Sequence, residues 1–215
     1  IAGIDTSSIS VFIVADAEPR TGDVFRGWFA IGEHRFDISW QTDLQNISVF
    51  NAGNYTWGNP NALPSSGFPA KIISVKKEKG VRLEQYINTV LDYSTTTPSL
   101  NAPFSNDIFQ IGRTTGIWSG YYKGNIFEII VFSGYLSDSS SAAVYGYLRN
   151  KYAPPVDLGP DQNASYGFCS ATLHAGTRFK SFQWFKDGYL LADTTESITV
   201  SQNGNYKVMV SDVFG

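Results

Sequence analysis

Cysteine and histidine are scarce in this chain of 215 residues, which contains only Cys169, His34 and His174. A single cysteine excludes a disulfide framework and a multi-cysteine metal site within the chain, and two histidines are too few for most zinc chemistry. No apolar stretch approaches the roughly 20 residues that cross a bilayer, so we expect no membrane insertion. The net charge is −3 and the basic residues form no run, which argues against a nucleic-acid-binding protein.

Catalytic motifs are missing as well. The sequence has no Gly-x-Ser-x-Gly elbow and neither histidine lies in a recognisable motif, so a nucleophilic triad is not indicated. Glycine loops that cradle phosphate are absent. The chain does contain 42% hydrophobic and 15% aromatic residues, which is enough for a packed core.

Short β-type runs, separated by clusters of Gly, Asn, Pro and Ser, make up the chain as far as Phe132. Many short strands with turn signals between them predict an all-β sandwich or jelly roll. The predicted strands are 10–17, 27–33, 35–40, 70–78, 81–88, 108–112 and 125–132.

One helix is predicted from Ser137 to Arg149, with Ser137 as its N-cap and Asp138 complementing the dipole in the first turn. Residues four apart lie on the same helix face, which predicts a docking stripe. That stripe consists of Val144, Leu148 and Tyr152.

The pattern stops at 153–157, where two prolines favour an extended spacer. About sixty residues then restart as short strands, a length suited to an immunoglobulin-like sandwich. We therefore predict a jelly-roll domain at 1–152, a proline-rich linker at 153–157, and a small sandwich domain at 158–215. Both ends of the chain read as cut from a longer protein, so we expect the second domain to be truncated at its C-terminal end.

The first domain resembles the laminin-G-like branch of the concanavalin A-like lectin/glucanase superfamily. The resemblance is carried by SVFIVADA with GWFAIG, by IISVKKEKGVRLEQYINTVLDYST, and by the closing IFQIGR…YYKGNIFEIIVFSGYLSDSSSAAVYGYLRNKY. One departure is Thr89, where the family usually has glycine, so a tight hairpin is less expected there. The family's first strand, which pairs beside the last one, is also absent and is expected upstream of Ile1.

The second domain resembles the Ig-like or PKD-like repeats of secreted Bacteroidetes surface proteins, through VDLGPDQ, CSATLHAG and NGNYKVMVSDVFG. The resemblance implies a buried Trp184 and a tyrosine corner at Tyr206. It also implies that Cys169 pairs with a cysteine that would follow Gly215. A small buried thiol at Cys169 is the alternative.

Glu128 lies in an otherwise apolar predicted strand, where it is a candidate for a catalytic acid or for a structural residue. The glucanases of the superfamily need two carboxylates alternating on one strand, and retention needs them about 5–5.5 Å apart. The in-phase neighbours of Glu128 are Ile126, Ile130 and Phe132. We therefore interpret Glu128 as structural, held by a loop or by a base such as Arg113.

Two glycine-rich and aromatic segments, 51–67 and 114–122, are the candidate ligand-binding loops. Aromatic rings on loops of a rigid sandwich can stack on the C–H faces of sugars, while Asn, Asp and Arg side chains read the hydroxyls. These rings could equally cover the edge of the core. The candidate binding residues are Asn54, Tyr55, Trp57, Asn59, Trp118 and Tyr121.

A calcium ion is the one cofactor that the sequence leaves open. Asp37, Asn106 and Asp107 could contribute oxygen ligands, although no spaced Asp-x-Asp-x-Asp run supports them. The sequence favours the alternative, that they are solvated turn residues.

These observations predict a non-catalytic module that binds glycans or mediates adhesion on a bacterial cell surface, with glycans and the other domains of a long chain as its partners. Two alternatives stay open: spacer domains in a stalk, and an accessory module of a secreted glycosidase.

Overall fold

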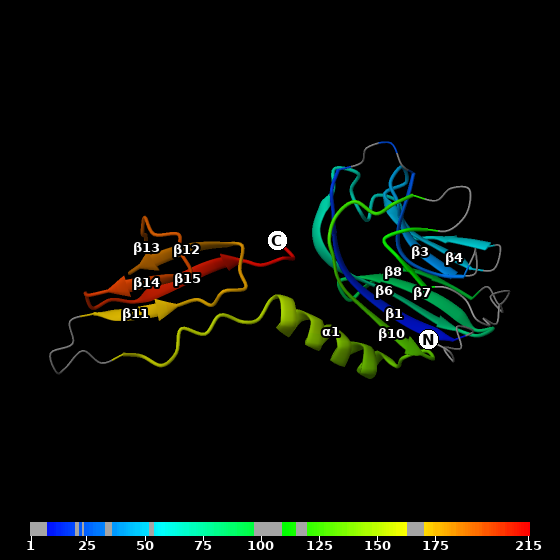
Figure 1. The fold of residues 1–215 in the computed structure, drawn as a ribbon. Helices are drawn as coiled ribbons and strands as arrows, with labels where there is room; N and C mark the ends of the chain where they lie inside the picture. The colour runs from blue at the N-terminus through cyan, green and yellow to red at the C-terminus, as the bar shows by residue number, and fades with distance from the viewer. Residues whose placement is uncertain are drawn as a thin grey trace. The chain divides into compact units, whose positions relative to one another are not determined.

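The computed structural model describes residues 8–19, 22, 24–32, 36–51, 54–96, 109–114, 120–162 and 170–215 (Figure 1). The chain divides into two compact units, Ile1–Tyr145 and Gly146–Gly215, which we call unit 1 and unit 2. The described residues contain no helix with the length and apolarity needed to cross a bilayer.

The first sheet of unit 1 has the strand order β10-β1-β6-β7-β8, and every pairing in it is antiparallel. Strand β1 lies between β10 and β6, which are far apart in the sequence, and β10 forms one edge of the sheet. The bounds are β1 Ile9–Ala17, β6 Phe68–Glu78, β7 Arg82–Ile87, β8 Val90–Thr95 and β10 Ile126–Ser133.

The second sheet has the order β5-β4-β3-β2-β9, again antiparallel throughout. The chain crosses from β1 in the first sheet to β2 in the second, and returns from β5 to β6. The bounds are β2 Phe25–Ile31, β3 Phe36–Gln41, β4 Asn46–Asn51, β5 Asn54–Trp57 and β9 Phe109–Ile111.

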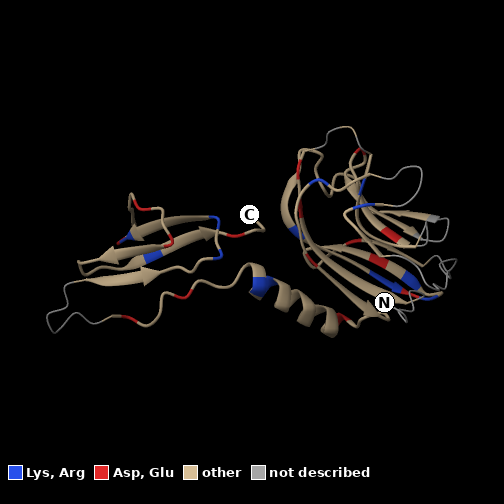
Figure 2. Ribbon diagram, viewed as in Figure 1, with Lys and Arg blue, Asp and Glu red and all other residues tan. Residues whose placement is uncertain are grey.

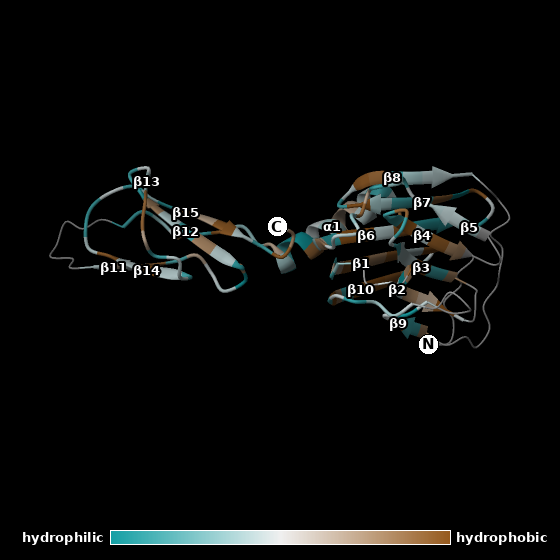
Figure 3. Ribbon diagram, turned by 90° about the horizontal axis from the view of Figure 1, so that it is seen from above, coloured by the Kyte–Doolittle hydropathy of each residue, from teal (hydrophilic) through white to brown (hydrophobic). Residues whose placement is uncertain are grey.

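The core of unit 1 lies between the facing surfaces of these two sheets. Alternate residues of each strand point into it, as the twofold side-chain period of a strand requires. Strand β1 supplies Ile9, Val11 and Ile13, and β3 supplies Ile38 and the fully buried Trp40. Figure 3 shows hydrophobic segments in the strands of both sheets. This architecture confirms the predicted all-β sandwich with one short helix.

Helix α1 comprises Asp138–Tyr152, and its first part contacts the outer face of the first sheet through Asp138 and Tyr145. Ser137 caps it, because its Oγ accepts a hydrogen bond from the Ser140 backbone N at 3.2 Å. The Tyr145 ring meets Phe12 edge-on at 5.4 Å between centroids, and its hydroxyl lies 2.6 Å from Ser74 Oγ. Tyr145, rather than the predicted Val144, is the buried residue at this level of the helix. The buried face is Ser141, Tyr145 and Leu148.

Unit 2 is a small sandwich of two antiparallel sheets, β11-β14 and β13-β12-β15. Trp184 is fully buried between them, and its indole Nε1 donates to Thr195 O at 2.9 Å. Tyr206 begins β15, and its hydroxyl donates to Gln202 O at 2.9 Å, which is the geometry of a tyrosine corner. The bounds are β11 Ala171–His174, β12 Ser181–Lys186, β13 Tyr189–Leu190, β14 Ser197–Val200 and β15 Tyr206–Ser211.

The turn at Asn88-Thr89 corrects one expectation from the sequence. It is a tight hairpin, because Ile87 pairs with Val90 directly across it. Asn88 has φ 51° and Thr89 has φ 78°, so both central residues adopt the left-handed conformation of a type I′ turn. A threonine is strained there because its branched Cβ crowds the backbone. Pairing of the flanking strands holds the turn without the expected glycine.

Candidate functional site

Tyr55 and Trp57 lie on a strand rather than in a long loop, which corrects the interpretation of segment 51–67. Strand β5 pairs with β4, with Tyr55 opposite Phe50 and Trp57 opposite Ser48. The two rings therefore project from the same face of the second sheet, the face turned away from the core. An edge strand paired on one side gives them a fixed backbone, which a loop would not.

Four aromatic rings gather on this outer face, and we call them the aromatic platform. Tyr55 and Trp57 stack with centroids 5.0 Å apart and planes 9° from parallel. Phe50 lies 4.7 Å from Tyr55, and Phe25 lies 6.0 Å from both stacked rings. Phe25 belongs to β2, which is three strand positions, or about 14 Å of backbone, from β5. The rings must therefore lean over the two strands between them.

Under the platform lies a buried polar floor. Its side chains point outward from β3 and β4, in register with the rings, yet little of them reaches solvent. Among the described residues, three buried atoms of this floor have no hydrogen-bond partner: Gln41 Oε1, Asn46 Oδ1 and Ser48 Oγ. Buried polar atoms without partners are rare in native proteins, so their grouping on one face is informative. The floor consists of Asp37, Ser39, Gln41, Asn46 and Ser48.

The described ends of the second candidate segment, Thr114 and Gly120, lie against β2. The Gly120 backbone N donates to Thr114 Oγ1 at 3.1 Å, and Gly27 N donates to Gly120 O at 3.5 Å. A Cβ on Gly120 would lie 1.6 Å from Phe25 O, so only glycine permits this approach. Both predicted segments thus converge on Phe25.

Of the two predicted binding residues in this segment, Trp118 and Tyr121, the structure describes Tyr121. Trp118 lies outside the described residues. Tyr121 is 66% exposed, and the Arg113 guanidinium carbon lies 5.6 Å from its ring centroid. Arg113 also forms an isolated β-bridge with Tyr121.

Asn54 and Asn59 flank the stacked rings along the chain. The backbone of Asn54 pairs with Asn51 at the hairpin end of β5. The backbone N of Asn59 donates to Asp92 Oδ2 at 3.3 Å, and its side-chain amide donates to Asp92 O. Asp92 belongs to β8 at the edge of the other sheet, so this contact closes the rim of the sandwich beside Trp57.

Sequence analysis did not find Phe25, Phe50 or Asp92. Phe25 and Phe50 looked like ordinary strand residues, and only the register reveals that they share an outer face with Trp57. The signal in the sequence was the alternation of Ser48, Phe50, Tyr55 and Trp57, which a β-hairpin at 46–57 would have explained.

Two groups, one on this face and one at its rim, have a raised pKa. Burial raises the pKa of the Tyr55 hydroxyl above its usual value, and the negative charge of Asp37 raises it further. Burial likewise raises the pKa of the Asp92 carboxyl, although the hydrogen bonds from Asn59 act in the opposite direction. Figure 2 shows acidic and basic residues scattered over unit 1 rather than gathered in one basic patch.

Glu128 and Arg113 lie on different sheets. Glu128 stands opposite Val14 on the edge strand β10 of the first sheet, half-buried on the sheet's outer face. Arg113 follows β9 of the second sheet and is exposed against Tyr121.

Of the calcium candidates, Asn106 and Asp107 lie outside the described residues, whereas Asp37 is buried in the floor beside Phe50. Within the described part of the chain, no three His, Cys, Asp or Glu side chains gather in a way that could hold a metal.

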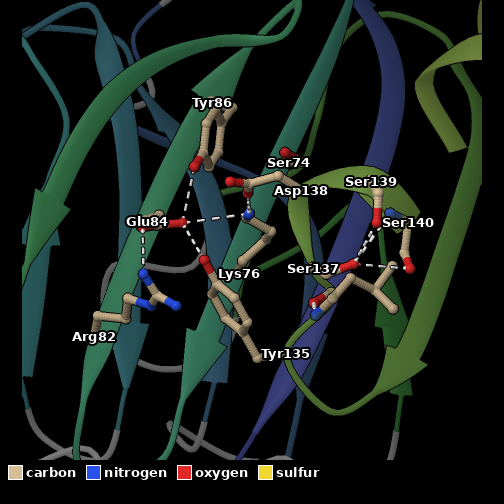
Figure 4. A network of polar contacts seen from close by, with 12 residues as sticks. Ser74, Lys76, Arg82, Glu84, Tyr86, Tyr135, Ser137, Asp138, Ser139 and Ser140 are labelled. Atoms are coloured by element: carbon tan, nitrogen blue, oxygen red, sulfur yellow. Dashed lines mark hydrogen bonds and ion pairs between the residues drawn. The ribbon is translucent and has the colours of Figure 1, made fainter. Parts of the chain in front are cut away.

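A second polar cluster, on the outer face of the first sheet, is a network of satisfied contacts (Figure 4). The Lys76 ammonium lies 3.0 Å from Asp138 Oδ1 and 3.4 Å from Glu84 Oε2. The hydroxyls of Tyr86 and Tyr135 donate to Glu84 Oε2 at 2.8 and 2.7 Å. The Lys76 ammonium also faces both rings, at 5.0 and 4.7 Å from their centroids.

The pKa shifts in this network show that Lys76 and Glu84 are both stabilised in their charged forms. Burial alone would raise the pKa of Glu84, but the two tyrosine hydroxyls and the charges of Lys76 and Arg82 hold it below its usual range. Burial would lower the pKa of Lys76, but its contacts with Asp138 and Tyr135 raise it overall. Every charge has a partner, so we interpret the network as an anchor for α1 rather than as a reactive site.

Comparisons with known proteins concern the fold. No protein-family model matches the chain, and no curated protein matches it by sequence. The carbohydrate-binding module CBM40 of Ruminococcus gnavus IT-sialidase, bound to α2,3-sialyllactose, is similar in structure with a TM-score of 0.52 at 14% identity, over 65% of this chain and 83% of that one. The same module bound to α2,6-sialyllactose has a TM-score of 0.52 at 14% identity, over 67% and 93%.

A third similar structure is domain 4 of AbnA, a GH43 extracellular arabinanase from Geobacillus stearothermophilus, in complex with arabinotriose. It has a TM-score of 0.46 at 16% identity, over 67% of this chain and 68% of that one. The Ruminococcus gnavus module was observed with a sialylated sugar and the AbnA domain with arabinotriose. At these identities, the likeness to the CBM40 module shows a shared fold.

Proposed function

We propose that unit 1 is a non-catalytic carbohydrate-binding module and that the aromatic platform is its binding face. The observation that carries the proposal is the stacked pair of Tyr55 and Trp57, both more than one-third exposed, standing above a buried polar floor. Sugars offer apolar C–H faces to aromatic rings and hydroxyls to polar groups, so a face that combines both suits them.

Within the stacked pair, the two rings have different roles. Tyr55 is flanked by Phe50 on one side and Trp57 on the other. Trp57 has one stacked neighbour, Tyr55, while Phe25 lies 6.0 Å away and tilted by 36°. Trp57 therefore offers its ring to a sugar, and Tyr55 and Phe50 hold that ring upright.

Two further observations support a binding role over catalysis. The described strands of the second sheet carry one carboxylate on this face, Asp37, whereas glycoside hydrolysis uses two. The fold is also one that carbohydrate-binding modules of other proteins adopt. The setting that we propose is extracellular, at a bacterial cell surface.

A glycan array probed with the purified chain tests this function, followed by calorimetric titration of the strongest ligand. The decisive variant is Trp57→Ala. A matched control is Tyr189→Ala, which removes a ring that is 79% exposed in unit 2. We expect Trp57→Ala to abolish binding and Tyr189→Ala to preserve it. Absence of binding to any glycan would favour a spacer role instead.

A further inference from the structure

A β-bulge places Asp92 at the rim beside the aromatic platform. The register of β7 and β8 shifts between Gln85 and Tyr86, so that Tyr93 pairs with Gln85 and Leu91 with Tyr86. Asp92 is the extra residue of β8. A bulge commonly changes the direction in which the side chain of its extra residue points. Its carboxylate reaches the end of β5 on the other sheet.

Gly58 makes this approach possible. It directly follows Trp57, and a Cβ at this position would lie 2.2 Å from Asp92 Oδ2 and 3.0 Å from Gln85 Oε1. The absence of a side chain therefore lets the carboxylate come against the backbone next to the exposed indole. Asp92 thus lies against Gly58 and Asn59, the two residues that follow Trp57, although it is far from them in the sequence.

The hydrogen bonds of Asp92 and Asn59 leave two acceptors open. The backbone N–H of Asn59 donates to Asp92 Oδ2, and its side-chain amide donates to Asp92 O. Among the described residues, no hydrogen bond reaches Asp92 Oδ1 or Asn59 Oδ1. Both remaining atoms accept hydrogen bonds, and one of them carries negative charge. Such a pair receives hydroxyl donors and opposes an anionic group.

We propose that Asp92 and Asn59 read the hydroxyls of a neutral sugar stacked on Trp57 and exclude acidic sugars. This inference rests on the carbohydrate-binding function proposed above and adds to it the class of ligand. It sets this chain apart from the CBM40 module of similar fold, which was observed with sialyllactose.

The first measurement uses the unmodified chain on an array of paired glycans that differ in acidity: lactose with α2,3-sialyllactose, galactan with polygalacturonate, and xylan with glucuronoxylan. We expect binding to neutral members and weaker or no binding to their acidic counterparts. Acidic members bound as well as, or better than, neutral ones would overturn the inference and leave the general function intact. No binding to any glycan would overturn both.

The second measurement compares Asp92→Asn with the unmodified chain, by titration with the neutral glycan that gave the strongest array signal. Asparagine keeps an oxygen for the Asn59 N–H but removes the charge. We expect a roughly tenfold or larger loss of affinity, as for the removal of a hydrogen bond to a charged group. The control is Asp193→Asn in unit 2, where the aspartate also accepts a backbone N–H, from Thr195 at 2.8 Å.

A purely structural Asp92 would give a different pattern. Asp92→Asn would then lower the melting temperature and leave affinity within about twofold at temperatures where the variant is folded. A pH titration separates the two cases further. Neutral-glycan affinity should fall on acidification through the raised pKa of Asp92, at a higher pH than an ordinary aspartate would give. Affinity that does not change with pH through that range would contradict the proposed role.

Discussion

Trp57 stands against Tyr55 with ring planes 9° from parallel and centroids 5.0 Å apart, although a threonine separates the two residues in the chain. Thr56, between them, points the other way and is buried. This arrangement follows from the twofold period of the strand, which puts alternate residues on one face. It presents a wide apolar surface at the cost of ordering only two side chains, each with two rotatable bonds.

Replacing Trp57 should separate binding from stability. Because Trp57 is 37% exposed, Trp57→Ala should cost less than the ~3–5 kcal/mol that truncation of a buried aromatic costs. Trp40→Ala, at a fully buried position, should cost that full amount. Urea unfolding of the two variants checks the contrast. A loss for Trp57→Ala as large as that for Trp40→Ala would assign Trp57 to the core. Trp118→Ala is expected to behave like Trp57→Ala.

Thr89→Gly should stabilise unit 1 by roughly 1 kcal/mol. The substitution relieves a β-branched residue at φ 78°, and glycine adopts that conformation without strain. The reverse change is available at Gly188, which has φ 86° in the β12–β13 turn of unit 2. Gly188→Thr should therefore destabilise unit 2. Differential scanning calorimetry measures the melting temperatures of both variants. A lower melting temperature for Thr89→Gly than for the unmodified chain would show that Thr89 does not strain the turn.

Glu84 should make the stability of unit 1 sensitive to acid. Its pKa in the folded chain lies below its usual value, so the folded state holds the proton less tightly than the unfolded state. The stabilisation is therefore complete above the unfolded pKa of about 4.3 and is lost as the pH falls through the lower folded pKa. Glu84→Gln should cost about 1–3 kcal/mol at pH 7 and remove this part of the pH dependence.

Urea unfolding between pH 3 and pH 7 gives the free energies for that comparison. Glu78→Gln is the matched control, since Glu78 is an exposed partner of Arg82. Parallel pH curves for Glu84→Gln and the unmodified chain would contradict the assignment.

Glu128→Gln should leave the chain without polysaccharide-cleaving activity, as we expect of the unmodified chain. Glu128 is half-buried opposite Val14, and its in-phase neighbours on β10 are apolar. Its loss should appear in stability alone. Release of reducing ends from a β-glucan that depends on Glu128 would show that this carboxylate is catalytic.

The strands of the core could be predicted because their apolar residues alternate, as in Ile9, Val11 and Ile13. The helix could be predicted because Ser137 gives a local capping signal. Strands β4, β5 and β8 were missed because they carry polar residues on their outer or edge positions.

The candidate site was harder to predict for a different reason. Tyr55 and Trp57 are visible in the sequence as aromatics in a polar segment. Phe25 joins them only through strand order, and Asp92 only through a register shift that brings two sheet edges together. Neither relationship has a local signature, because both depend on contacts between distant segments.

Helix α1 runs unbroken from Asp138 to Tyr152, and the boundary between the two units falls inside it, after Tyr145. Tension on the C-terminal unit therefore enters unit 1 along this helix. The Lys76–Asp138 ion pair and the contact of Tyr145 with Ser74 take up that load. Strand β6 is paired with β1 on one side and with β7 on the other, so we expect α1 to detach before β6 does. We therefore expect a pulled chain to lengthen first by detachment of this helix, while the sheet that carries Trp57 stays folded.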